Sequence, residues 1–131
     1  MSLPVRTAAF PDAHVTPDAR SALETADRLV VGLVEGDAAA VERELDLSVC
    51  AWWRDGGRLS TTHGPTAVAR ALLALIAERR PERLSSRATL EGSVIVSALG
   101  SDRLAWSLEL REEHGRVVGC VVRGVSPPAT H

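Results

Sequence analysis

Apolar residues recur every three or four positions after Pro17, the spacing that places them on one face of a helix. The repeated positions are Ala19, Ala22, Leu23, Ala26, Leu29, Val30, Leu33 and Val34. Thr16 and Pro17 suit the start of this helix, and Gly36 suits its end. Asp37 can cap a second, shorter helix that runs to Glu44. The first part of the chain is therefore expected to be helical.

The pattern changes to alternation over residues 47–54, which predicts a β-strand. Residues 55–57 read Asp-Gly-Gly, which suits a hairpin turn, and a second strand returns to Thr62. Alternation places Trp52 and Trp53 on opposite faces of the first strand. We assign Trp53 to the inner face, although the alternation alone establishes only that the two side chains point apart.

Residues 65–79 predict a third helix, opened by Pro65 and apolar over most of its surface. Its main apolar stripe consists of Val68, Ala71, Leu72, Leu75 and Ile76. A helix that is apolar on most sides should be covered on most sides. We therefore expect it to lie between a sheet and the first helix.

The rest of the chain is typical of β-strands. Residues 87–99 predict one long strand, bent by a bulge at Gly92-Ser93, and residues 103–112 predict a second. The second strand places large apolar residues inward, namely Leu104, Trp106, Leu108 and Leu110. A last strand is expected over residues 116–125, with either Val118, Cys120 and Val122 or the opposite set facing inward.

The composition agrees with one globular domain. The chain has 131 residues, of which 45% are hydrophobic and 24% charged. We expect an irregular arm at residues 1–15, the domain at 16–125 and a disordered tail at 126–131. The sequence shows no signal peptide and no apolar run long enough to cross a bilayer, so we expect a cytoplasmic protein without a membrane partner. The net charge of −2 gives no electrostatic case for nucleic acid.

Several residue types are missing, and this restricts the possible chemistry. All fifteen basic residues are arginine, and the chain has no lysine, tyrosine, asparagine or glutamine. A phosphate-binding loop that needs lysine is therefore excluded. The four histidines lie far apart without paired spacing, so we expect no metal site and no cofactor. Cys50 and Cys120 both fall in expected strands and are interpreted as reduced core residues.

Two short stretches resemble a known superfamily. They are residues 34–41 (Val-Glu-Gly-Asp-Ala-Ala-Ala-Val) and residues 64–68 (Gly-Pro-Thr-Ala-Val). Together with the order helix, short helix, hairpin, helix and sheet, they resemble the nuclear transport factor two-like superfamily, including its SnoaL-like branch. The resemblance implies an α+β, cone-shaped fold of three helices packed on a curved, mainly antiparallel sheet. It also implies an apolar cavity between the helices and the sheet, and a homodimer formed through the sheet.

A narrower likeness involves residues 52–58 (Trp-Trp-Arg-Asp-Gly-Gly-Arg), followed by residues 63–73. This stretch is similar to the SnoaL-like C-terminal domain of some extracytoplasmic-function sigma factors. The chain has no room for the sigma domains, so it would be a free-standing relative.

Acid–base chemistry has few candidate residues. The tyrosine-dependent mechanisms of related isomerases and dehydratases cannot be transferred to a chain without tyrosine. Of the remaining groups, His63 could exchange protons near the cavity mouth and Asp55 could act as a base. The alternatives are a loop histidine bonded to the backbone and an ordinary turn aspartate. An enzyme of the cyclase, isomerase or dehydratase kind requires these two side chains to converge.

We therefore expect a SnoaL-like domain that binds a small apolar or aromatic molecule, without changing it, and that regulates a partner. The residues expected to line its pocket are Trp53, His63, Leu72, Ile76, Trp106 and Cys120. One alternative is the enzyme that uses His63 and Asp55. The other is an interaction module whose cavity is filled by its own side chains, with Trp53 and Trp106 as the plug. Apolar residues on both faces of the last strands favour a homodimer, with Val121, Ala105 and Trp52 at the contact.

Overall fold

The computed structural model describes residues 17–101 and 103–128, with side chains from Arg20 onward and without that of Arg103. The expected N-terminal arm and residues 129–131 of the expected tail lie outside these residues. At the start of that tail, the hydroxyl of Ser126 donates a hydrogen bond to Asp55 Oδ2 at 3.0 Å.

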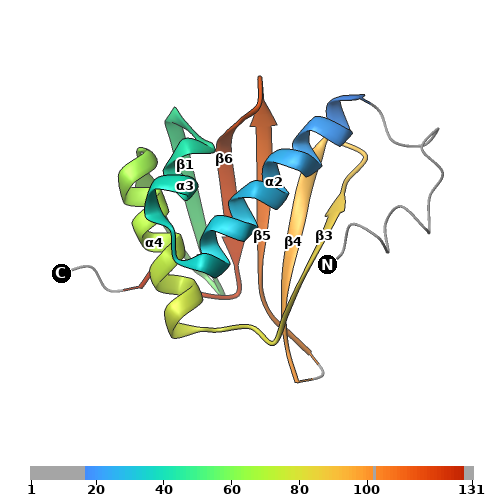
Figure 1. Cartoon of the computed structure of the whole chain (residues 1–131). Helices are drawn as coiled ribbons and strands as arrows, with labels where there is room; N and C mark the ends of the chain where they lie inside the picture. Colours follow the sequence, from blue (N-terminus) through green and yellow to red (C-terminus); the bar gives the residue numbers. More distant parts are fainter. Residues whose placement is uncertain (1–16, 102, 129–131) are drawn as a thin grey trace.

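Three helices and six strands make up the described chain (Figure 1). The helices are α2 (Pro17–Glu35), α3 (Ala38–Arg43) and α4 (Pro65–Glu78). The strands are β1 (Leu45–Asp55), β2 (Arg58–His63), β3 (Arg83–Ala88), β4 (Ser93–Gly100), β5 (Arg103–Glu113) and β6 (Arg116–Arg123). They form one sheet in the order β2-β1-β6-β5-β4-β3. Only the β1–β6 pair is parallel, so the fold is α+β with a mainly antiparallel sheet.

The turn between α2 and α3 follows from its residues. Gly36 has a φ of 70°, a conformation that glycine adopts without steric cost. Asp37 then caps α3, because its Oδ1 accepts the N–H of Ala40 at 3.1 Å. The two helix boundaries predicted at this turn are confirmed.

All three helices cover the same face of the sheet (Figure 1). Helix α2 crosses β6, β5, β4 and β3, while α4 lies over β1 and β2 and also contacts α3. The prediction that the third helix lies between the sheet and the first helix is therefore wrong, because α4 and α2 share one layer. The apolar sides of α4 are covered by the hairpin beneath it and by the neighbouring helices.

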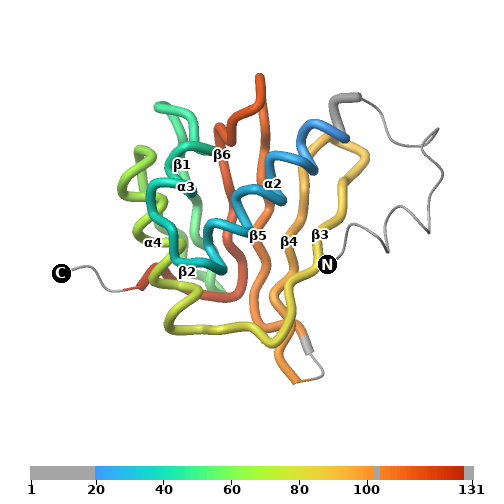
Figure 2. The backbone as a smooth tube through the Cα atoms, in the orientation of Figure 1, coloured from blue at the N-terminus to red at the C-terminus, as the bar shows by residue number. Residues whose placement is uncertain are grey.

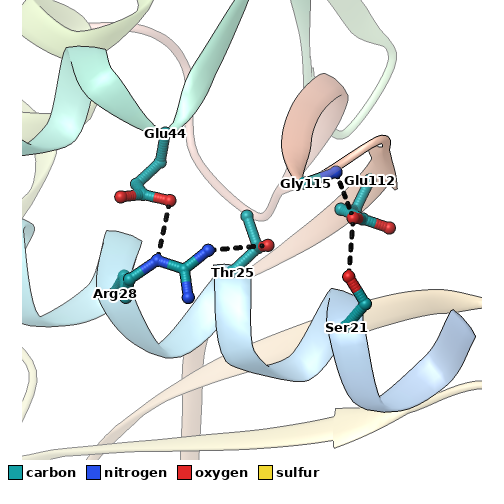
Figure 3. Close-up of polar contacts among 6 residues, drawn as sticks. All are labelled: Ser21, Thr25, Arg28, Glu44, Glu112 and Gly115. Atoms are coloured by element: carbon teal, nitrogen blue, oxygen red, sulfur yellow. Dashed lines mark hydrogen bonds and ion pairs between the residues drawn. The ribbon is translucent and has the colours of Figure 1, made fainter. Parts of the chain in front are cut away.

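Two polar contacts join α2 to distant parts of the chain (Figure 3). Arg28 Nε donates to Glu44 Oε1 at 3.1 Å, next to the start of β1. Ser21 Oγ donates to Glu112 Oε2 at 3.0 Å, and the same oxygen accepts the N–H of Gly115 at 2.6 Å. The first contact is half exposed, and such an ion pair adds at most about 1 kcal/mol. These bonds position α2, and the buried apolar residues supply most of the stability.

The segment from residue 83 to residue 100 differs from its prediction. It forms two antiparallel strands, β3 and β4, where one bent strand was expected. The chain reverses at residues 89–92, because Gly92 adopts a φ of 88° and the Thr89 and Ser93 hydroxyls bond each other at 2.8 Å. The glycine that was interpreted as a bulge thus closes a hairpin turn.

Irregular pairing also changes which residues face the helices. Leu104 was expected inside but is exposed, since the β4–β5 register shifts beside it and turns its side chain outward. In β6 the register that the sequence left open is resolved: Cys120 and Val122 face the helices. Val118 has no partner on β5, because the pairing passes from Gly119 directly to Val117 and leaves a β-bulge between them. The bulge reverses the alternation, so Val117 is buried in place of Val118.

Candidate functional site

Four of the six expected pocket residues are almost completely buried in the core. Trp53, Leu72 and Cys120 are each 1% exposed, and Trp106 is 3% exposed. Both indole groups have protein partners: Trp53 Nε1 donates to Thr62 Oγ1 at 3.0 Å, and Trp106 Nε1 donates to the Arg79 carbonyl at 3.2 Å. Solvent therefore does not reach these side chains, and their polar groups need no ligand to satisfy them.

The two cysteines occupy different environments. Burial is the main cause that raises the pKa of Cys120, to about 12, and burial also raises the pKa of Cys50. Cys120 faces the helices, whereas Cys50 pairs with Gly119 on the opposite face of the sheet. A thiol with such a raised pKa stays protonated and is a poor nucleophile. Both cysteines are free thiols in the structure.

His63 and Asp55 do not come together. They lie at opposite ends of the β1–β2 hairpin, where His63 pairs with Cys50 and Asp55 pairs with Arg58. The two pairs are five residue steps apart along the strand, which separates them by about 16 Å. Cross-strand partners point to the same face, so His63 lies on the side without helices and not at a cavity mouth. The shared acid–base site expected for the enzyme alternative is not formed.

A groove opens at the surface where α2, the end of α4 and the start of β3 meet. Its volume is about 330 Å³, and its lining consists of Val30, Val34, Ile76, Arg80, Pro81, Glu82, Arg83 and Leu84. Helix α2 contributes two valines one turn apart, and the end of α4, the connection to β3 and the start of β3 contribute the other lining residues. Figure 2 shows the path of this connection from α4 to β3. Ile76 is the one expected pocket residue that lines this groove.

The lining combines an apolar floor with charged groups at its edge. Arg80 is exposed and forms no ion pair with any described residue. Oε2 of Glu82 has partners within the protein, because it accepts the N–H of Ser101 at 2.7 Å and the Ser101 hydroxyl at 3.2 Å. Arg80 and Arg83 are the positively charged groups of the lining, and Arg83 is likewise exposed and without an ion pair to any described residue. Such a surface can hold an apolar molecule with an acidic group, and it contains no neighbouring acid–base pair.

Sequence reasoning missed most of this groove. Arg80 follows the end of the third helix, where an arginine also suits the negative end of the helix dipole, so its position in the sequence does not by itself indicate a binding site. Val30 and Val34 were assigned to the core face of α2, yet Val34 is largely exposed. The groove forms from segments about fifty residues apart in the chain, which no local motif records.

Over residues 17–101 and 103–128, no three side chains of the metal-binding types gather at one place. None of the helices in this part of the chain is both long and apolar enough to span a bilayer.

Comparison with known proteins supports the fold. No protein-family model and no curated protein matches the sequence. Among solved structures, an NTF2-like protein of unknown function from Mesorhizobium loti is 14% identical, with a TM-score of 0.62 over 84% of this chain and 95% of that one. An NTF2-like protein from Burkholderia xenovorans is 18% identical, with a TM-score of 0.55 over 79% and 88%. A de novo designed protein with a curved β-sheet is 16% identical, with a TM-score of 0.59 over 79% and 84%.

These likenesses define the class of fold. The chain has an NTF2-like fold, in which the three helices of its described part cover one face of a curved, six-stranded and mainly antiparallel sheet.

Proposed function

We propose that this protein is a SnoaL-like binding domain that holds a small apolar or aromatic molecule with an acidic group. The observation that carries the proposal is the groove beside α2, where an apolar floor meets two arginines, Arg80 and Arg83, that form no ion pair with any described residue. Binding sites of small molecules are usually concave and mostly apolar, with a few polar groups that orient the ligand. The proposed binding site is therefore this surface groove, whereas the sequence predicted a pocket between the helices and the sheet.

The dimensions of the groove limit the ligand. A volume of about 330 Å³ lies at the lower end of the range for small-molecule sites. One or two rings, or a short acyl chain, would cover Val30, Val34 and Ile76. A carboxylate or sulfonate at one end could then reach the guanidinium of Arg80, whose N–H groups can bond two oxygens of such an anion at once.

Anilinonaphthalene sulfonate is a suitable probe, because it combines aromatic rings with one acidic group. We expect saturable binding to the folded protein, with one strong site. Val34→Glu should weaken this binding about tenfold or more, since it places a charge on the apolar floor. Arg80→Glu should weaken it by a few-fold, as for an exposed ion pair.

The neighbouring residue Val31 provides a matched control. Val31 is 46% exposed and Val34 is 57% exposed, both on α2, but only Val34 lines the groove. Val31→Glu should therefore leave the affinity unchanged. Equal weakening by the two substitutions, or binding that persists in Val34→Glu, would count against the groove.

An interaction module is the second candidate function. The observation that favours it is the position of Trp53 and Trp106, which fill the interior as the plugged alternative requires. The two candidates are compatible, because the groove lies outside this plug. The separation of His63 and Asp55 gives the enzyme alternative no support.

A further inference from the structure

The sheet has a second face that no described helix covers (Figure 1). Three cross-strand rows of side chains form this open sheet face. The central row runs from Thr61 on β2 to Arg87 on β3, and the two flanking rows contain Arg111 on one side and Arg54 with Arg123 on the other.

The charge of the open sheet face differs from that of the whole chain. The three rows contain four arginines, Arg54, Arg87, Arg111 and Arg123, and one carboxylate, Glu109, which gives +4 − 1 = +3 with His63 neutral. The whole chain carries −2. Positive charge is therefore concentrated on this face.

The single carboxylate is already occupied within the face. Glu109 Oε2 accepts the Ser93 hydroxyl at 2.9 Å, and Oε1 accepts Arg123 Nη1 at 3.0 Å. These bonds, with the Ser93 bond first, lower the pKa of Glu109, so it stays ionised at neutral pH. Arg54, Arg87 and Arg111 form no ion pair with any described residue.

The central row is partly apolar. It places Trp52 beside Val121, with Ile95 two strands further along and Glu109 between Val121 and Ile95. A Cβ at Gly119 would lie 3.4 Å from Trp52 Cζ3, so the indole lies over the glycine. Trp52 nevertheless remains 40% exposed. Tryptophan and arginine are the residues most enriched at the energetic centres of protein interfaces.

From this arrangement we propose that the open sheet face binds an acidic amphipathic segment of another protein. Its apolar residues cover Trp52, Val121 and Ile95, and its carboxylates on both sides reach the arginines of the flanking rows. Neighbouring rows on one face of a sheet are about 7 Å apart along the strands. A helix about 10 Å wide that lies along the central row therefore brings carboxylates on its two sides close to the arginines of the flanking rows. The proposal gives the interaction-module candidate a surface and a partner, and it does not depend on the groove.

Two other occupants fit less well. Single-stranded nucleic acid is usually held by several aromatic side chains that stack on successive bases, and the three rows offer one tryptophan. A second copy, the homodimer expected from the sequence, would place one +3 surface against another, which is unfavourable at short range. Both occupants are outcomes of the test below.

The test uses a synthetic acidic peptide with a leucine stripe flanked by glutamates. The central row spans about 24 Å across six strands, so a helical peptide of about sixteen residues covers it. A fluorescent label reports binding to the full chain by anisotropy. Glutamine replaces glutamate in one control peptide, and serine replaces leucine in another. We expect the acidic leucine peptide to bind and both controls to bind about tenfold more weakly or not at all.

Variants of the protein locate the site. Arg54→Glu with Arg111→Glu should reduce peptide affinity about tenfold or more, and Trp52→Ser should do the same. Arg43→Glu with Arg70→Glu is the matched control, because these exposed arginines lie on helices and the net charge changes equally. The control should bind as the unchanged protein does. All variants should bind anilinonaphthalene sulfonate equally, which separates a failure here from a failure of the groove.

Three results would overturn the proposal. The first is equal peptide binding by the arginine variants of the sheet and of the helices. The second is tighter binding of a thymidine oligonucleotide than of the peptide, weakened by Trp52→Ser, which would assign the face to nucleic acid. The third is a dimer in sedimentation that Trp52→Ser dissociates, which would assign the face to a second copy.

Discussion

Replacement of Trp53 by alanine tests whether the interior is filled by its own side chains. Trp53 is 1% exposed, and its indole N–H bonds Thr62. Truncation of a fully buried tryptophan costs about 3–5 kcal/mol, from lost burial and from the cavity left behind. At about 3–4 °C per kcal/mol for a chain of this size, the melting temperature should fall by roughly 10–20 °C. Urea unfolding followed by circular dichroism measures the change in unfolding free energy.

The adjacent tryptophan provides the control. Trp52 lies on the open sheet face and is partly exposed, so Trp52→Ala should cost only about 1 kcal/mol. Trp53→Phe keeps most of the buried ring and should cost about 1–2 kcal/mol of unfolding free energy. This variant provides the measurement if the alanine variant does not fold. Indole added to folded Trp53→Ala should raise its melting temperature, because a dry apolar cavity can take up a small apolar ring. Equal costs for Trp52→Ala and Trp53→Ala would refute a packed interior.

Three further predictions concern individual groups. Asp37→Ala should lower the unfolding free energy by about 1 kcal/mol in urea denaturation, because it removes the cap of α3, whereas Glu35→Ala nearby should have little effect. The hydrogen bond from Ser93, and then that from Arg123, lower the pKa of Glu109 in the folded chain below its ordinary value of 4.5. Its stabilising contribution is therefore present above about that pH and lost as the pH falls through the folded pKa, so urea denaturation across this range should show a component that Glu109→Gln lacks. In a thiol assay at about pH 8, Cys50 should react before Cys120, and Cys120 should react only on unfolding; rapid labelling of Cys120 in the native protein would contradict its burial.

Much of the fold could be predicted from local patterns. The apolar stripe of α2, the Asp37 cap and the Asp-Gly-Gly turn each carry a local signal that agrees with the structure. The β3–β4 turn was missed because residues 89–92 contain one glycine and none of the Asn-Gly or Pro-Gly pairs that mark a tight reversal. Leu104 was assigned to the core because a register shift leaves no trace in the alternation itself.

The candidate site was less predictable than the fold. Pocket residues were chosen from large apolar side chains, but Trp53 and Trp106 are the residues that a core uses to fill space. The groove is lined by Val34 of α2 and Leu84 of β3, and only the tertiary packing of these two elements brings the two residues to one place. The position of His63 could have been predicted from the sequence, because the length of the hairpin turn sets the register that pairs it with Cys50.

The central claim is that ligands bind in the groove beside α2 and outside a packed interior. Backbone amide and indole signals of the isotope-labelled protein, recorded by NMR during titration with anilinonaphthalene sulfonate, test it most directly. We predict saturable shifts at the amides of Val34, Ile76 and Leu84, with the indole signal of Trp53 unchanged. Shifts centred on Trp53 and Leu72, with the groove amides unmoved, would contradict the account.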